Sequence, residues 1–484
     1  MSLEEFSKSH EIVIGLEVHA QLTTDFKLMS PASNRFGKSP NSSVSSVCTG
    51  MPGALPVLNQ KAIEMAVKTA LALHCKIQSP NVFSRKHYFY PDLPKGYQIS
   101  QYDLPYAKSG RVEFYLEGQK RSVGLQRIHM EEDAGKNLHF GDQGISLVDL
   151  NRSSVPLIEI VSEPELRSAD EAGAYLRALR RVLRYLEVCD GNMEEGNFRC
   201  DANVSIRKQG ETRLGTRVEL KNINSFRNLE RAIQNEALRQ WDLLKQDKLV
   251  VQETRSWDAN ENLSRSMRSK EEAADYRYFP EPDLLPLSLS DDWIENRRKA
   301  LPELPLDRME RFMKDFERSA YDAEVLTSSK QLADYFEEIA LPLKDYSLAS
   351  NFIQTTVLAS LQDVEKGLED FYPDAPALTE LLQELKQGKL SLNMAKEVFE
   401  EMKTSRQPAS KIISEKGLSQ VNDDSILRSC VKTVIQNHPA QLEQFKAGKD
   451  KLFGFFMGQC QKELKGKGNP ATLKALLEEE LKQS

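Results

Sequence analysis

Apolar and polar residues alternate in several parts of the chain, and one such pattern, interrupted by a turn, lies within residues 198–221. In its first half the even positions are apolar, and the odd positions are polar: Asp201, Asn203, Ser205 and Arg207. A period of two residues predicts a β-strand. The same period continues at Val218–Lys221 after a turn at 208–210, which predicts a second, paired strand. Asp and Asn are weak strand formers, so their mid-strand positions favour a functional polar face, with an ordinary solvent-facing sheet surface as the alternative.

Other predicted strands also carry acids. Glu17 and His19 share the polar face of an early alternating segment, a spacing that suits metal ligation or acid–base chemistry as well as a plain exposed surface. Glu159 lies in a strongly apolar run, where a carboxylate has to be paired, protonated or bound to a metal. Glu131 and Glu132 end another predicted strand. Acidic clusters usually face solvent, but a loop at a strand end is also a common place for cation ligands.

Helical periodicity accompanies these strands up to about residue 290 and continues alone after it. Apolar residues recur every three or four positions over 60–74, 169–186 and 226–241. A capping box at Ser168 marks the start of the second of these helices. The pattern therefore predicts a mixed α+β part followed by an all-helical part.

The composition is that of an ordinary globular protein, with 484 residues of which 40% are hydrophobic and 28% charged. No apolar run approaches the roughly 20 residues that span a membrane, and the first residues lack a secretory signal pattern. Six cysteines without a CxxC pair indicate free thiols in a reducing cytoplasm. Because the net charge is −7, nucleic-acid binding requires a local basic patch. Six lysines between 446 and 467 supply one, and a solvated lysine-rich face has the same composition.

Three loops have a distinctive composition. Residues 86–105 hold five aromatic residues, three prolines and two lysines, and residues 253–287 interleave four arginines with Trp, Tyr and Phe. Both loops suit stacking on a base and contacts with phosphate, with core packing and an ion-paired surface as the alternatives. Residues 23–59, rich in Ser, Pro, Asn and Gly, form a long loop of the kind that is usually functional or flexible.

Long motifs occur in order along nearly the whole chain. They include GLEVHAQL (15–22), YFYPDLPKGYQISQ (88–101), DLNRSSVPLIEIVSEPEL (149–166), EGNFRCDANVSIR (195–207) and FGFFMGQCQKELKGKGNP (453–470). Together they resemble the GatB family, the B subunits of glutamyl/aspartyl-tRNA amidotransferases. The resemblance implies an antiparallel-sheet cradle domain similar to glutamine synthetase and guanidino kinases over 1–290. It also implies a helical domain over 291–407 and a helical tRNA-binding tail over 408–484.

The resemblance further implies an ATP-dependent carbon–nitrogen ligase with glutamine as amido donor. This chain would bind tRNA misacylated with Glu or Asp, phosphorylate the side-chain carboxylate with ATP and Mg²⁺, and allow ammonia to displace the phosphate. Phosphoryl transfer requires charge neutralisation and positioning. The ammonia would come from a separate amidase-type glutaminase within a cytoplasmic heterotrimer, which also contains a small third protein and no membrane part. The choice between Glu-tRNA and Asp-tRNA stays open.

The resemblance and the residue chemistry together nominate the site. Mg²⁺ prefers oxygen ligands, so the expected metal ligands are mostly acids: Glu17, His19, Glu131, Glu132, Glu159 and Asp201. His is an uncommon Mg²⁺ ligand, and an orienting role for His19 is the alternative. The expected catalytic residues are Glu17, His19, Glu159, Asp201 and Lys221. The residues expected to bind the nucleotide and its phosphates are Arg199, Asn203, Arg207 and Glu219.

Many relatives carry a zinc knuckle in the 23–59 loop. The corresponding positions here are Ser30, Ala32, Ser45 and Cys48. One thiolate cannot form a four-ligand structural site, so no zinc is predicted.

Two other functions compete with this interpretation. The first is a non-catalytic tRNA-binding scaffold, and Glu159 beside Asp201 argues against it, because unpaired buried carboxylates destabilise a fold that holds no cation. The second is a small-molecule carboxylate kinase or amide ligase, for which a basic helical tail would have no use.

Overall fold

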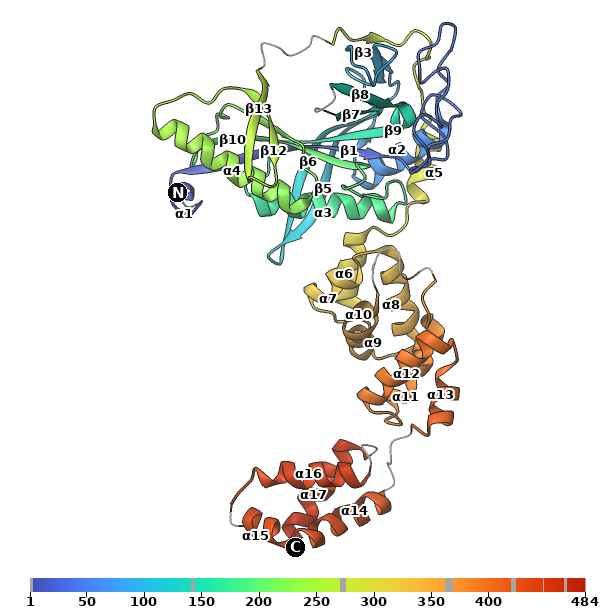
Figure 1. The fold of residues 1–484 in the computed structure, drawn as a ribbon, viewed down its shortest axis with the longest axis vertical. Coiled ribbons are helices and arrows are strands. Elements are labelled where there is room, and N and C mark those ends of the chain that lie inside the picture. Colours follow the sequence, from blue (N-terminus) through green and yellow to red (C-terminus); the bar gives the residue numbers. More distant parts are fainter. Residues whose placement is uncertain are drawn as a thin grey trace. The chain divides into compact units, whose positions relative to one another are not determined.

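The computed structural model describes residues 3–140, 144–269, 276–361, 368, 370–418, 424–446, 448–464 and 468–483 (Figure 1). Lys465 and Lys467 of the predicted basic patch, and residues 270–275 of the arginine-rich loop, lie outside these described residues. The chain divides into two compact units, the first ending at Asp307 and the second beginning at Arg308. Each unit is described by itself below. Among the helices of the described residues, none is long and apolar enough to cross a membrane.

A nine-stranded sheet forms the centre of the first unit within the described residues, in the order β13-β12-β11-β10-β1-β9-β6-β5-β2. All neighbours pair antiparallel except β11 and β12, which are parallel. The strands are β1 (His10–Gln21), β2 (Lys76–Ile77), β5 (Ala107–Leu116), β6 (Gln119–Glu132), β9 (Pro156–Ser162), β10 (Phe198–Lys208), β11 (Val218–Lys221), β12 (Glu253–Asp258) and β13 (Leu263–Ser269). The two strands predicted from residues 198–221 pair as expected, with Ala202 opposite Leu220.

Helices pack on the apolar face of this sheet (Figure 1). They are α1 (Leu3–Ser7), α2 (Gln60–Ala72), α3 (Ala169–Tyr185) and α4 (Phe226–Lys245), with α5 (Asp291–Lys299) against α2. The predicted cap is present, since the Ser168 hydroxyl accepts a hydrogen bond from the Glu171 amide (3.0 Å). Val204 on β10 and Leu179 on α3 are fully buried in this core. The core therefore occupies one face of the sheet and leaves the opposite face for polar side chains.

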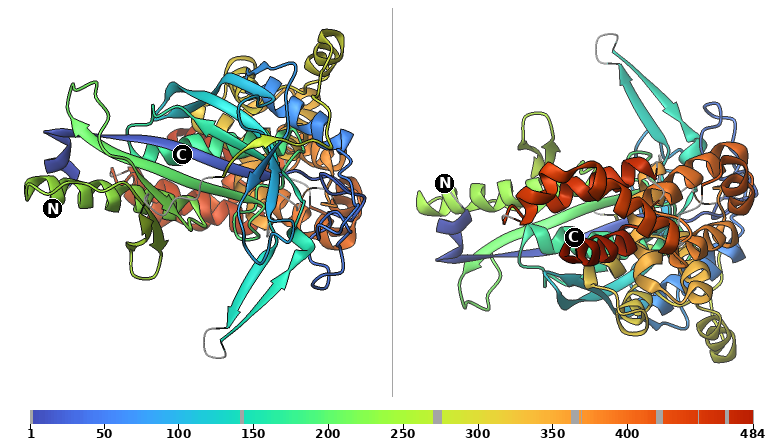
Figure 2. Two further views of the ribbon diagram at one scale, coloured as in Figure 1. Left: turned by 90° about the horizontal axis from the view of Figure 1, so that it is seen from above. Right: turned by 90° about the horizontal axis from the view of Figure 1, so that it is seen from below.

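The described part of the first unit also contains two smaller sheets. One has the order β14-β3-β4, formed by β3 (Ser84–His87), β4 (Tyr97–Ser100) and β14 (Phe279–Pro280). The other is the hairpin of β7 (Lys136–Phe140) and β8 (Ile145–Asp149), which projects from the side of the unit (Figure 2). A short helix, η2 (Leu150–Arg152), follows this hairpin. β4 packs against β6, so the three-stranded sheet lies beside the central sheet.

The second unit is helical throughout its described residues. Its helices are α6 (Pro305–Asp315), which spans the boundary, α7 (Ala320–Leu326), α8 (Lys330–Leu343), α9 (Tyr346–Phe352), η4 (Ile353–Val357), α10 (Leu358–Ser360), α11 (Ala375–Lys386), α12 (Leu392–Ser405), α13 (Ala409–Lys416), α14 (Asp424–Asn437), α15 (Pro439–Lys446), α16 (Leu452–Glu463) and α17 (Pro470–Gln483). The predicted α+β fold followed by helices is confirmed.

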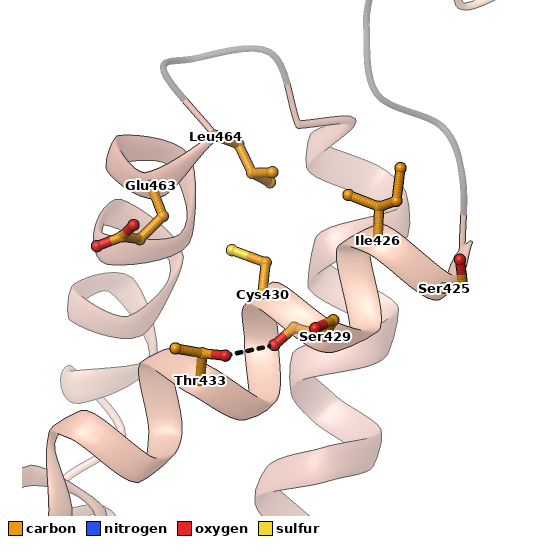
Figure 3. Close-up of a pocket in the computed structure, with 7 residues that line it drawn as sticks. All are labelled: Ser425, Ile426, Ser429, Cys430, Thr433, Glu463 and Leu464. Atoms are coloured by element: carbon orange, nitrogen blue, oxygen red, sulfur yellow. Dashed lines mark hydrogen bonds between the residues drawn. The ribbon is translucent and has the colours of Figure 1, made fainter.

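The last helices have a core of their own. Leu427 and Val431 of α14 pack with Phe456 of α16 and Leu477 of α17, and all four side chains are fully buried. A pocket of about 500 Å³ opens between α14 and α16 (Figure 3). Its lining is Ser425, Ile426, Ser429, Cys430, Thr433, Glu463 and Leu464. None of the predicted site residues belongs to this lining.

Candidate active site

The polar face of the central sheet carries a row of charged side chains across five neighbouring strands. Cross-strand register sets the row, because Glu17 lies opposite Asp201, His19 opposite Glu159, and Glu159 opposite His129. Side chains directly opposite each other in an antiparallel pair lie close enough to interact. The strands bring together residues that are up to about 200 positions apart in the chain. We call the row the carboxylate cluster; its acids are Glu17, Glu131, Glu159, Asp201 and Glu219.

Two histidines lie against the acids at the β9 end of the cluster. Nε2 of His19 lies 3.2 Å from Oε2 of Glu159, and Nε2 of His129 lies 3.5 Å from the same oxygen. His129 Nε2 is also 3.8 Å from Glu131. Burial alone would raise the pKa of Glu159, but His129 and His19 hold it well below its usual value. Glu159 is therefore ionised at neutral pH although it is nearly inaccessible to solvent.

The three-stranded sheet contributes two further side chains to this end of the cluster, next to Glu131. Nζ of Lys86 on β3 lies 3.7 Å from Oε2 of Glu131, and the Ser100 hydroxyl at the end of β4 donates to the same oxygen (3.1 Å). Burial opposes the ionisation of Glu131, but the charge of Lys86 and the His129 hydrogen bond lower its pKa to about 2. The charge of Glu131 in turn raises the pKa of Lys86, against the effect of burial.

A second group of side chains lies at the β11 end. Nζ of Lys221 is 2.6 Å from Oδ2 of Asp201 and 3.1 Å from Oε1 of Glu219. The Asn203 amide donates to Oε1 of Glu17 (3.0 Å). Burial opposes the protonation of Lys221, but Asp201 and Glu219 raise its pKa, so the ammonium stays charged. Lys221 is thus a fixed cation within a partly buried acidic surface, as phosphate binding requires.

The donor atoms of the cluster fit a divalent cation. One ligand atom each from His19, Glu131 and Glu159 lie within 4.8 Å of one another. Burial and the charge of Glu159, followed by those of Glu219 and Asp201, raise the pKa of Glu17. Glu17 therefore experiences an excess of negative charge, which a bound cation would relieve. Oxygen-rich sites of this kind suit Mg²⁺.

Three of the predicted residues lie outside the cluster or at its edge. The Arg199 guanidinium contacts Asp133 (2.9 Å), so Arg199 lies at the edge of the cluster. The charge of Asp133 raises the pKa of Arg199. Arg207 lies further along β10, where its Nε is 2.7 Å from Oε1 of Glu11. Glu132 points to the other side of β6 from its neighbour, where Lys95 and the Ile99 amide (2.9 Å) donate to Oε1.

His129 and Lys86 are the main residues that the sequence-based prediction did not include. His129 lies two positions before Glu131 on β6, so the two-residue period could have placed both on one face. No local pattern reveals Lys86, because its position depends on how a separate small sheet packs against β6. His129 is buried and Lys86 is half-buried, and both lie against carboxylates of the cluster.

The loop at 23–59 contains a different buried site. The Lys27 ammonium lies 3.6 Å from Sγ of Cys48, and the Ser45 and Ser30 hydroxyls lie 3.3 and 3.7 Å from the same sulfur. Burial works against the Cys48 thiolate, but Ser45 and Lys27 lower its pKa. Zinc requires four Cys, His or acidic ligands, and one cysteine with hydroxyls and Ala32 does not fit that requirement.

Comparisons with known proteins agree along nearly the whole chain. A family model described as "GatB/GatE catalytic domain" matches residues 12–295, and one described as "GatB domain" matches residues 334–481. Three curated proteins, from Thermodesulfovibrio yellowstonii, Syntrophotalea carbinolica and Geobacter sulfurreducens, are each 50% identical to this chain. The alignments cover 98% of this chain and 98–100% of each relative. All three are named as the B subunit of an aspartyl/glutamyl-tRNA(Asn/Gln) amidotransferase.

Proposed function

The chain belongs to the GatB family of aspartyl/glutamyl-tRNA amidotransferase B subunits, and we propose that its carboxylate cluster is the site where the side-chain carboxylate of a misacylated tRNA is phosphorylated. As a member of this family it serves a glutamine-dependent ligase that amidates Glu-tRNA(Gln), Asp-tRNA(Asn) or both. The observation that carries the proposal is the row of carboxylates, histidines and lysines on one face of the sheet, in a chain so similar to amidotransferase components over its full length.

The proposed reaction has two steps. An oxygen of the substrate carboxylate attacks the γ-phosphorus of ATP, forming an acyl phosphate and releasing ADP. Ammonia then attacks the carbonyl carbon of the acyl phosphate, and phosphate leaves. The second step needs the first because a free carboxylate has no adequate leaving group. In the first step catalysis consists of positioning and of neutralising the phosphate charge.

The chain's residues divide these tasks. His19, Glu131 and Glu159, with Glu17 and Asp201 beside them, would hold Mg²⁺, which neutralises phosphate charge when bound. Lys221 offers an ammonium to the transferred phosphate, and Asn203 fixes the orientation of the Glu17 carboxylate. Arg199 at the edge of the cluster is the further candidate for phosphate contact. His129 and Lys86 keep Glu159 and Glu131 ionised and oriented.

The remaining parts of the assignment follow from the family. We propose a heterotrimer in the cytoplasm, in which an amidase-type glutaminase supplies ammonia and a small third protein completes the assembly. The division into a catalytic domain (1–290), a helical domain (291–407) and a tail (408–484) is retained as a proposal. The tail, with Lys446, Lys449 and Lys451 among its basic residues, would bind the tRNA body through phosphate contacts.

The test uses the assembled complex with glutamine, ATP and Mg²⁺. ATP hydrolysis is measured with misacylated tRNA and with the correctly amidated tRNA. The acyl phosphate is trapped with hydroxylamine as the side-chain hydroxamate, which is separated from the α-hydroxamate that hydroxylamine forms from any aminoacyl-tRNA ester. The proposal expects turnover and a side-chain hydroxamate only with the misacylated form, and loss of both in Glu159→Gln. Full amidation by Glu159→Gln with unchanged tRNA binding would instead support a non-catalytic scaffold.

A further inference from the structure

Four tyrosines gather on one face of the three-stranded sheet, the face that adjoins the carboxylate cluster. The register pairs Phe279 of β14 with Arg85 of β3, which sets Tyr278 beside Lys86. The backbone amide of His87 donates to the Tyr276 carbonyl (3.0 Å), so the 276–278 segment is fixed along β3. Tyr102 follows two positions after Ser100, the residue whose hydroxyl binds Glu131. Alternation therefore places Lys86, Tyr278 and Ser100 on the same face. Tyr102 lies beyond the end of β4, and its contact with the Tyr278 ring sets it on this face.

The rings form a continuous series of contacts, called the stack below, that begins at Lys86. Its ammonium lies 5.3 Å from the centroid of the Tyr276 ring, a cation–π contact. Tyr276 meets both Tyr88 and Tyr278 edge-on, at centroid distances of 6.1 and 6.0 Å. Tyr278 lies parallel to Tyr102, with centroids 4.2 Å apart and planes 6° apart. The stack thus runs outward from the cation that neutralises Glu131.

Tyr102 is the outer end of this stack and is 53% exposed. Tyr278 covers one face of its ring, so the exposure belongs to the other face and the ring edge. A flat aromatic ring that is held rigidly on one side and open on the other is what base stacking requires, and every nucleobase offers a matching π-face. Large aromatic residues usually pack in the core, but Tyr102 is too exposed for that role.

We infer that the Tyr102–Tyr278 pair is the stacking platform for an adenine base whose attached phosphate or ester group reaches the carboxylate cluster. This inference rests on the proposed function, because that function requires two substrates which both carry adenine. In ATP, the ribose and the α- and β-phosphates separate the base from the reacting γ-phosphate. Aminoacyl-tRNA ends in an adenosine whose ribose carries the reacting amino acid. Either base would stack on the same platform.

The experiment measures equilibrium dissociation constants of the assembled complex, so it does not depend on amidation activity. The ligands are ATP with Mg²⁺, deacylated tRNA, and the same tRNA without its terminal adenosine. The variants are Tyr102→Leu, Tyr102→Phe, which keeps the ring, and Tyr90→Leu as the matched control. Tyr90 is 57% exposed, in the segment that joins β3 to β4, and none of the ring contacts of the stack involves it. Because both positions are largely exposed, the three variants are expected to fold.

Loss of one base-stacking contact weakens binding by roughly 5- to 150-fold. If the platform takes the base of ATP, Tyr102→Leu raises the Kd of ATP by about tenfold or more, and Tyr102→Phe and Tyr90→Leu leave it within about twofold. If it takes the tRNA terminus, the preference for intact over truncated tRNA disappears in Tyr102→Leu alone. Unchanged Kd values for ATP and for both tRNAs in Tyr102→Leu would overturn the inference. A Glu159→Gln complex that still amidates would overturn the proposed function and leave these Kd values informative.

Discussion

Replacement of Glu131 by Gln tests whether the carboxylate cluster depends on ion pairs across the two sheets. Glu131 is buried, and its pKa falls from an ordinary value of 4.5 to about 2, because the charge of Lys86 and the His129 hydrogen bond outweigh the effect of burial. A difference of this size corresponds to about 3 kcal/mol of folding free energy at neutral pH. Glu131→Gln keeps the shape of the side chain and removes the charge, so we expect the free energy of unfolding to fall by about that amount.

The pH dependence of this loss has a definite sign. Since the folded-state pKa lies below the unfolded-state value, the stabilisation is complete above pH 5 and is lost as the pH falls towards 2. By pH 4 the unfolded chain already binds part of a proton at this position. The difference between the wild type and Glu131→Gln should therefore shrink by roughly 1 kcal/mol between pH 7 and pH 4.

Urea unfolding of the full chain followed by tryptophan fluorescence measures this difference. The chain's three tryptophans, Trp241, Trp257 and Trp293, all lie in the first unit, so the signal reports that unit alone. Glu261→Gln is the control, because Glu261 is half-exposed in its ion pair with Arg265 and should contribute less than about 1 kcal/mol. Equal stability of Glu131→Gln and the wild type at pH 7, or a difference that grows towards pH 4, would refute the reasoning.

Three further predictions concern other parts of the chain. Arg199→Ala should slow acyl-phosphate formation in single-turnover assays by about 100-fold, because Arg199 borders the cluster. Arg207→Ala should change this rate by less than about threefold, because Arg207 pairs with Glu11 away from the cluster. Equal effects of the two substitutions would contradict the geometry. Cys48→Ala should lower the free energy of unfolding in urea by about 3 kcal/mol, because it removes the sulfur partner of the buried Lys27 ammonium. Adding Lys27→Met to Cys48→Ala should recover part of that loss. A double variant that is less stable than Cys48→Ala alone would count against the pair. Removal of residues 424–484 should raise the KM for aminoacyl-tRNA by about tenfold or more through lost phosphate contacts, and an equal rise in the KM for ATP would argue against a tRNA-binding tail.

The sequence was enough to predict which face of each strand is polar, but not which strands lie next to each other in the sheet. Alternation placed Asp201 and Asn203 on a polar face, and the structure agrees. The meeting of Glu17 with Asp201 depends on the pairing of strands far apart in the chain, which the similarity to a known family supplied and local periodicity could not. The same limit explains Lys86, which reaches Glu131 through the packing of two separate sheets. The family resemblance itself is confirmed by the comparisons over nearly the full chain.

Alternation also says nothing about distance along a strand. Arg207 shares the polar face with Asp201, but the six residue steps of extended chain between them span roughly 20 Å. Arg207 therefore contacts Glu11 and lies away from the cluster. Glu131 and Glu132 show the complementary effect. They are adjacent, but because β6 continues through Glu132 they point to opposite sides, and only Glu131 faces the cluster.

The arrangement explains how weak strand formers persist in the middle of the central strands. Asp201 and Asn203 each have strand partners on β1, and their side chains bind Lys221 and Glu17, so cross-strand contacts offset their low strand propensity. The opposite face of the same strand is fully buried at Val204 and holds the sheet together through the core. One strand therefore supplies stability through its even positions and polar chemistry through its odd ones. Substitutions on the polar face should alter the chemistry while the fold survives, whereas a large-to-small change at Val204 would weaken both.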